Sequence, residues 1–389
     1  MTSSRCSASG FPECRGPEDA MDFELDETHQ AVRDLAEQIL SDRSTPAHLR
    51  EVEAGNGFDA STWTDLAKAG LVGIAAPDHV GGGGLGLVAA GEVAHAVGRH
   101  TAAVPYVQAV ASAMTLAEAG QSDDLAELID GARVVVPALD LGPDPATTRH
   151  PTLTAMAFDG GWRVSGEVLA VAFGGVAHQF VVPASLDGGE RVLLSVPLDA
   201  PGLRRTATAT TALLPAANIR FDAVEVDAKR RLGDGGAVDV LVDRLRVLTC
   251  RAMAGVCQGT LTLAAAYTSE REQFGSKIGT FQAVAHRLAD AYIDGQAIDL
   301  TSRQAAWRVE EGLDSTRELS GACFWAAEGG QRIVHATQHV HGGIGVDTDY
   351  PQHRYFRWAK DLELQLGGAN RSLVELGADL ARVPAGMAD

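Results

Sequence analysis

Hydrophobic positions recur at helical spacing near both ends of the chain and at strand spacing in the middle. Apolar residues between Val32 and Ile39 follow the i, i+3, i+4, i+7 spacing of one helix face. From 134 to about 232, short β-branched or alternating runs are separated by Gly, Pro and Asp, which predicts a small antiparallel β domain. From 236 to 380 the pattern is helical again, in long segments with short connections, which indicates a four-helix bundle.

These changes divide the chain into four parts. Residues 1–20 form a polar leader that we expect to be disordered or the product of a misassigned start, with Met21 as the natural first residue. Residues 21–133 should form an N-terminal α-helical domain, 134–232 a middle β domain, and 233–389 a C-terminal four-helix bundle. The predicted strands are the runs 133–137, 152–158, 162–164, 179–182, 192–196 and 218–221. Two bundle helices carry apolar stripes, formed by Phe281, Ala285, Leu288 and Tyr292 and by Phe324, Ala327, Ile333 and Val334.

Composition narrows the class of protein. With 389 residues, 46% of them hydrophobic, the chain can bury a large core divided among two or three domains. A net charge of −19 argues against a nucleic-acid partner, because phosphate contacts need clustered Lys and Arg. No run of apolar residues is long enough for a transmembrane helix.

Cysteine and histidine usage points to a cytoplasmic protein without a metal site. Cys250, Cys257 and Cys323 lie in helical, apolar-rich surroundings, while Cys6 and Cys14 lie in the leader, so we expect reduced thiols and not a disulfide framework. The histidines lack metal-ligand spacing, and no Cys-x-x-Cys occurs.

The motif Tyr267-x3-Arg271-x-x-Phe274-Gly275, followed by Gln282 and by the His-Gly-Gly-Ile-Gly segment that starts at His341, carries the candidate chemistry. This combination, with the order of helical domain, β domain and bundle, resembles the acyl-CoA dehydrogenase family from about Met21 to Leu380. The motif segments look most like the non-catalytic (β) subunits of heteromeric acyl-CoA dehydrogenases that act on steroid side chains attached to coenzyme A. The resemblance implies a mainly α fold with a central β domain.

In this family FAD lies extended across a subunit interface. The resemblance implies that Arg271 binds the FAD diphosphate or ribose, and that Phe274 and Gln282 line the adenine end. A guanidinium suits phosphate because it forms charge-assisted forked hydrogen bonds. Consecutive glycines let backbone N–H groups approach a phosphate closely. The segment implied to approach the pyrophosphate from a neighbouring chain is His339, Val340, His341, Gly342 and Gly343.

Each motif has a plainer interpretation by itself. Arg271 next to Glu270 and Glu272 is typical of a surface ion pair, and His-Gly-Gly is typical of a helix C-cap. Arg271, the spacing to Gln282 and the second glycine segment together favour the FAD site.

The base that α,β-desaturation requires is missing at both positions where the family carries it. One position falls in residues 364–370, which contain Gln365 but no acid. The other falls on Leu245. Asp243 should point to another helix face, and Glu363 would fit only if the alignment slipped. The sequence therefore predicts no catalytic residue.

The flavin-ring half of the site is also degenerate. Family members hold the isoalloxazine ring with hydroxyl-bearing and Trp-containing segments, and the corresponding residues here, 138–148 and 168–175, lack a recognisable match. The chain therefore retains only the adenine end of a shared site.

Three functions remain open. The first is the accessory subunit of an FAD-dependent α2β2 acyl-CoA dehydrogenase, inactive alone, whose catalytic partner supplies a Glu base. Its implied substrate is a CoA thioester of a sterol side chain, and its implied acceptor is an electron-transfer flavoprotein. The second is a self-sufficient homotetramer that uses a displaced acid such as Asp243 or Glu363. The third is a cofactor-free scaffold with a relic fold.

Overall fold

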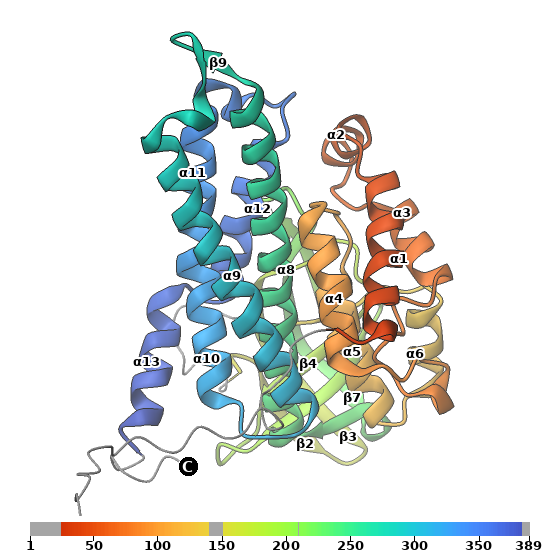
Figure 1. The fold of residues 1–389 in the computed structure, drawn as a ribbon. Helices are drawn as coiled ribbons and strands as arrows, with labels where there is room; N and C mark the ends of the chain where they lie inside the picture. The colour runs from red at the N-terminus through yellow and green to blue at the C-terminus, as the bar shows by residue number, and fades with distance from the viewer. Residues whose placement is uncertain (1–24, 140–150, 209, 383–389) are drawn as a thin grey trace, which may run out of the picture.

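The computed structural model describes residues 25–139, 151–208 and 210–382. Six helices before the sheet stand beside a bundle of longer helices, and the sheet lies against the lower end of both groups in Figure 1. The helical domain, central sheet and helical bundle confirm the predicted fold class. The leader, residues 1–20 with Cys6 and Cys14, lies outside the described residues.

The N-terminal helices begin where polar side chains cap them. Asp26, Thr45 and Asp59 each accept a hydrogen bond from a backbone N–H in the first turn that follows. The fourth and fifth helices are buried along nearly their whole length. The elements are α1 (Glu27–Arg43), α2 (Pro46–Ala54), α3 (Ala60–Lys68), α4 (Gly86–Arg99), α5 (Tyr106–Glu118) and α6 (Ser122–Ile129).

The central sheet joins strands in the order β6-β7-β3-β2-β4-β5-β8, with β1 also paired to β4. Its strands are β1 (Val135–Pro137), β2 (Thr154–Phe158), β3 (Gly161–Val171), β4 (Gln179–Ser185), β5 (Arg191–Pro197), β6 (Leu203–Thr208), β7 (Ala216–Asp227) and β8 (Arg231–Asp234). The sheet is antiparallel, as predicted, except that β4 pairs in parallel with both β1 and β2. Each of these strands reaches β4 through an intervening excursion instead of a hairpin, which permits parallel pairing.

The bundle is built around one long helix, α8 (Gly235–Glu270), whose middle is buried on all sides. A short hairpin, β9 (Glu272–Gln273) and β10 (Ser276–Lys277), connects it to the next helix at the upper tip of the molecule in Figure 1. A π-helical segment, Trp325–Gly329, interrupts the third long helix. The remaining helices are α9 (Gln282–Glu310), α10 (Thr316–Phe324), α11 (Gly330–His341), α12 (Gln352–Gln365) and α13 (Ala369–Leu380).

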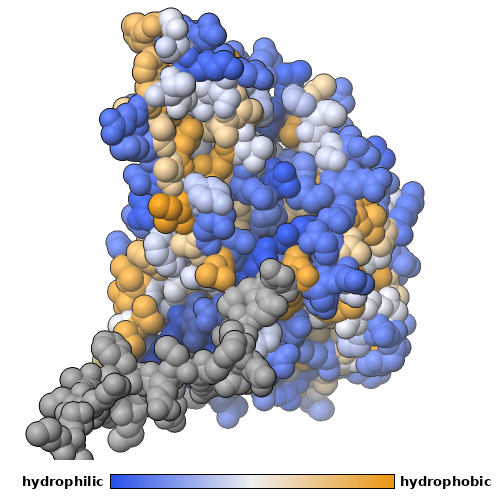
Figure 2. All heavy atoms as spheres, viewed as in Figure 1, coloured by the Kyte–Doolittle hydropathy of each residue, from blue (hydrophilic) through white to orange (hydrophobic). Residues whose placement is uncertain are grey.

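The two predicted apolar stripes have different environments. Ala327, Ile333 and Val334 are buried, as an inward-facing stripe requires. The stripe from Phe281 to Tyr292 instead lies mostly at the protomer surface, and α9 buries a different set that includes Ala291 and Ile298. Figure 2 shows apolar residues in orange along this edge of the bundle. This face of α9 is therefore not covered by any of the residues that the structure describes.

The cysteine prediction is confirmed for the three described thiols, since Cys250, Cys257 and Cys323 are free and buried. No helix in the described ranges is long and apolar enough to cross a membrane.

Candidate functional site

The Arg271 hairpin presents an exposed aromatic ring at the tip of the bundle. α8 ends at Glu270, and Arg271 is extended, with its carbonyl oxygen accepting from the N–H of Ile278 at 2.9 Å. Phe274 has a left-handed backbone (φ 54°) and is 95% exposed. Its ring meets Phe281 edge to face, and Gln282, which begins α9, is exposed beside it. The Phe274 ring is therefore available for stacking with a group from outside the protomer.

The glycine turn that follows α11 is open. Gly342 has φ 62° and ψ −138°, which a residue with a Cβ rarely adopts. Gly343 has an ordinary φ, and a Cβ there would meet nothing within 4 Å, so the protomer's own packing does not require this glycine. His339 before the turn is exposed, whereas Val340 is buried. The bare backbone at Gly343 fits close approach of an external group such as a phosphate.

His341 joins the hairpin to the glycine turn. Its buried ring stacks on Tyr267 of α8, with ring centroids 4.7 Å apart. Nδ1–H donates to the Thr337 carbonyl oxygen at 2.7 Å, and Nε2 accepts from the Tyr350 hydroxyl at 3.1 Å. Burial lowers the pKa of His341, which agrees with a neutral ring. The His341 side chain is therefore committed inside the protomer, and this segment can approach an external group only through the exposed His339 and the backbone of the glycine turn.

The Arg271 side chain is exposed, and among the described residues no carboxylate, including Glu270 and Glu272, forms an ion pair with it. The structure therefore does not show Arg271 in the surface ion pair that its neighbours in the sequence suggested. An available guanidinium, an open glycine turn and an exposed Phe ring fit the adenine and pyrophosphate end of FAD.

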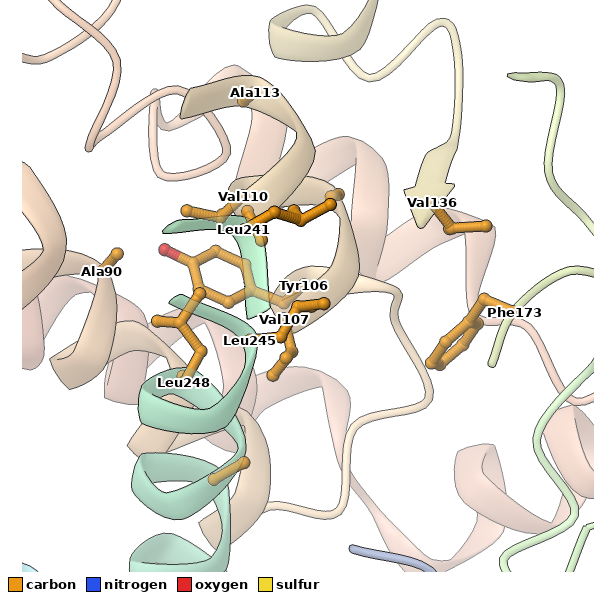
Figure 3. Close-up of a cluster of buried hydrophobic side chains, with 14 of the residues drawn as sticks. Ala90, Tyr106, Val107, Val110, Ala113, Val136, Phe173, Leu241, Leu245 and Leu248 are labelled. Atoms are coloured by element: carbon orange, nitrogen blue, oxygen red, sulfur yellow. The ribbon is translucent and has the colours of Figure 1, made fainter. Parts of the chain in front are cut away.

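A cavity of about 300 Å³ lies between the sheet and the helices. We call it the Leu245 cavity. Leu245 lines it, together with Leu364 and Gln365 from the stretch 364–370 in which the resemblance implies the second base position. Figure 3 shows Leu245 with Leu241 and Leu248 on α8, in one apolar cluster with Tyr106 and Val107 of α5. The other lining residues are Gln108, Pro137, Leu139, Leu169, Ala170, Ala172, Thr210, Thr211, Leu214, Thr249, Asp361 and Leu364.

Asp361 is the carboxylate that the sequence interpretation missed in this cavity. The Gln365 amide donates to Asp361 Oδ2 at 2.8 Å, and its oxygen accepts from Gln108 at 3.4 Å. Burial raises the pKa of Asp361 to about 6, although the bond from Gln365 lowers it. Asp361 stands one helical turn before Gln365, so i, i+4 spacing was the signal available.

The two acids considered from the sequence do not line the Leu245 cavity. Glu363 forms an ion pair with Lys360, with Nζ and Oε2 2.6 Å apart. Asp243 acts on the buried Arg246, whose pKa its charge helps to raise. Asp361 is the only acidic residue among those described that line the cavity.

The wall that would face a flavin ring is hydrocarbon. Leu169, Ala170 and Ala172, from the end of β3 and the turn after it, line the Leu245 cavity, and residues 168–175 carry no hydroxyl. This wall does not fit the ring end of FAD, whose polar edge needs hydrogen-bond partners. Most of the other predicted ring-binding segment, residues 138–148, lies outside the described residues.

We expect Asp361→Asn to stabilise the protein above pH 7 and to leave it unchanged near pH 4. Because its pKa is raised to about 6, folded Asp361 holds its proton more tightly than the unfolded chain does, so its contribution to stability falls as the pH rises toward 6. Asparagine does not titrate, and the gain should be about 1–3 kcal/mol at pH 8. Urea unfolding between pH 4 and 8 measures it.

The exposed Asp187→Asn is the matched control, with an expected change within about 0.5 kcal/mol at every pH. A loss of stability for Asp361→Asn at pH 8 would contradict the expectation.

Among the described residues, no group of three or more His, Cys, Asp or Glu side chains is placed to hold a metal ion.

Comparison with known proteins defines the class of this fold and site. The family described as "Acyl-CoA dehydrogenase, N-terminal domain" matches residues 26–128, and "Acyl-CoA dehydrogenase, C-terminal domain" matches residues 237–378. The chain belongs to the acyl-CoA dehydrogenase family, whose cofactor is FAD. The acyl-CoA dehydrogenase FadE27 of Mycobacterium tuberculosis (strain ATCC 25618 / H37Rv) is 40% identical over 386 residues, which cover 94% of this chain and 100% of that protein.

Two solved structures are similar along nearly the whole chain. A variant of the Tcur3481-Tcur3483 steroid ACAD has a TM-score of 0.87 and 40% identity, covering 92% of this chain and 98% of that one. The ChsE4-ChsE5 complex from Mycobacterium tuberculosis has a TM-score of 0.88 and 37% identity, covering 94% of this chain and 100% of that one.

Proposed function

We propose that this chain is the accessory subunit of an α2β2 acyl-CoA dehydrogenase and contributes the adenine and pyrophosphate end of a shared FAD site. One observation carries the proposal. Leu245 and the stretch 364–370, where the family resemblance places the base, meet at one cavity through Leu245, Leu364 and Gln365, and none of these three side chains can accept a proton at neutral pH. The opposite end of the site, at Arg271 and the glycine turn, keeps its exposed groups.

Bound FAD supplies the hydride acceptor for α,β-desaturation of an acyl thioester. The residues of this chain bind and orient the adenine and pyrophosphate end of the FAD. Arg271 binds the diphosphate or ribose through charge-assisted hydrogen bonds. Phe274 and Gln282 line the adenine, where an exposed ring offers a stacking surface. The backbone N–H groups at Gly342 and Gly343 approach the pyrophosphate.

The catalytic partner supplies the Glu base, the ring-binding pocket and most of the acyl-CoA cleft. Similarity to a steroid ACAD and to the ChsE4-ChsE5 complex supports a heteromeric assembly that acts on the CoA thioester of a sterol side chain. An electron-transfer flavoprotein is the proposed acceptor. A partner sequence with Glu at the position matched by Leu245 would agree with this division of roles.

Flavin stoichiometry tests the proposal. We expect the chain purified alone to carry no FAD and to lack desaturase activity. Co-expressed with its catalytic partner, it should form a complex with one FAD per heterodimer, because only one composite site has both a base and a ring pocket. Flavin absorbance after denaturation, divided by protein concentration, gives the ratio. Two FAD per heterodimer would contradict the proposal.

Asp361 favours a second candidate, the self-sufficient homotetramer. A buried carboxylate with a raised pKa suits a general base better than Asp243 or Glu363, which lie outside the Leu245 cavity. If the chain alone is yellow and desaturates acyl-CoA, and Asp361→Asn abolishes the activity, this candidate replaces the first. Unchanged flavin content after Arg271→Ala in the complex would favour the cofactor-free scaffold.

A further inference from the structure

The Leu245 cavity has walls that are mostly hydrocarbon, including Leu169, Leu214, Leu245 and Leu364. Leu169 and Leu364 are 57% and 61% exposed, so two large apolar side chains stand where the cavity opens to the surface. Arg271, at the end of α8, is about 39 Å along that helix from Leu245, at ~1.5 Å per residue. The FAD contacts proposed for this chain therefore leave the cavity free for another ligand.

One carboxylate oxygen of Asp361 is open to this cavity. Oδ2 accepts from the Gln365 amide at 2.8 Å, whereas Oδ1 accepts no hydrogen bond from the described residues and is not sealed inside the protein. The Asp361 residue is only 9% exposed, and none of the cationic side chains that the structure describes pairs with it. Buried polar atoms in native proteins are almost always hydrogen-bonded. A donor for Oδ1 can therefore come from a molecule in the cavity.

The size and polarity of the cavity select the kind of donor. A volume of about 300 Å³ is at the lower end for ligand pockets, which suits a compact molecule and not a sterol joined to coenzyme A. An ammonium group would bring three donors, and a buried ion pair gains little beyond its desolvation cost. A hydroxyl donates one hydrogen bond to Asp361 and accepts one from the amide of Gln108, which lines the same cavity.

We propose that the Leu245 cavity binds a compact, uncharged alcohol, whose hydroxyl donates to Asp361 Oδ1 and whose hydrocarbon body packs against the leucines of the wall. This site belongs to the present chain and does not depend on the assignment of the FAD contacts. Burial raises the pKa of Asp361 to about 6, so the carboxylate is ionised at pH 8. Hydrogen bonds to an ionised acceptor are roughly twice as strong as neutral ones, so the hydroxyl determines selectivity.

The test is calorimetric titration of the co-expressed complex with cyclohexylmethanol at pH 8. Cyclohexyl methyl ether is the comparison, because it contains the same atoms but no hydroxyl donor. We expect saturable binding of the alcohol and at least about tenfold weaker binding of the ether. Asp361→Asn keeps the oxygen to which Gln365 donates and turns an NH₂ group toward the cavity. It should therefore weaken the alcohol at least about tenfold and leave the ether unchanged.

Two further variants of this chain locate the site. Ala172→Leu narrows the cavity and should weaken both probes. Glu363→Gln, on the same helix as Asp361 but outside the cavity, should change neither. Binding in a pocket of the catalytic partner would not respond to these variants. The proposal is overturned if the alcohol does not bind saturably, if the ether binds as well, or if Asp361→Asn leaves the alcohol unchanged. Binding of cyclohexylmethylamine at least about tenfold tighter than the alcohol would also overturn it, by showing a cation site.

Discussion

Arg271→Ala is expected to remove most of the FAD from the co-expressed complex and to leave the complex assembled. The exposed Arg271 guanidinium forms no ion pair with a described carboxylate, so the substitution breaks no contact that holds the protomer together. Losing charge-assisted hydrogen bonds to a diphosphate costs about 1.5–3 kcal/mol, or roughly a 10- to 150-fold increase in the Kd for FAD. Dialysis followed by flavin absorbance measures the retained cofactor, and size-exclusion chromatography reports assembly.

Arg163→Ala serves as the control for this substitution. Arg163 is an exposed guanidinium in β3, paired with Glu225, and lies in the sheet, away from the bundle tip. Its loss should leave flavin content unchanged. Arg271→Lys keeps the charge without the fork, so an intermediate flavin content is expected. Full FAD occupancy in Arg271→Ala would remove Arg271 from the cofactor site.

Glu92→Gln is expected to destabilise the chain by about 3–5 kcal/mol, because it leaves buried guanidiniums without their shared carboxylate. Glu92 is fully buried and connects Arg33 of the N-terminal domain with Arg251 of the bundle. Glutamine preserves the shape but not the charge, so Arg33 would lose the carboxylate that pairs with it and Arg251 would keep only Asp299. The shift in the midpoint of urea unfolding measures the destabilisation. Tryptophan fluorescence should follow the unfolding, because the substitution loosens the junction between the two helical domains.

The matched control is Glu225→Gln, which removes the carboxylate of the exposed pair with Arg163. Water screens that pair, so a change within about 0.5 kcal/mol is expected. Equal destabilisation by the two substitutions would show that the Glu92 network is not a buried charge centre.

The sequence predicted the elements that bury one face and missed those that do not. β7 and β4 were found because β-branched runs alternate or stay apolar. β6 was missed because Leu203–Thr208 is mostly solvent-exposed and carries no apolar alternation. The stripe on α9 was identified, but its environment was not, since periodicity shows which residues share a face and not whether the same chain covers it.

At the candidate site, too, the sequence identified individual positions but not how the folded chain packs them together. Leu245 and the stretch 364–370 were found because the family resemblance implies a base at each. Their convergence on one cavity depends on how α8 and α12 pack, which separate motifs do not report. Asp361 was missed because it precedes the expected stretch, and its raised pKa arises from burial that only the packed bundle creates. The segment that contains His341 was predicted to approach the cofactor, and the motif did not indicate that the His341 side chain itself stacks on Tyr267.

The stack of His341 on Tyr267 affects how this surface would bind a cofactor held by another subunit. Tyr267 and His341 fasten the Arg271 hairpin to the glycine turn, although the two segments are far apart in the sequence. The surface is therefore pre-organised, because its conformational entropy is lost when the protomer folds and not when the dinucleotide arrives. Docking then needs no loop closure, and the lifetime of the assembled site depends on how quickly the subunits separate.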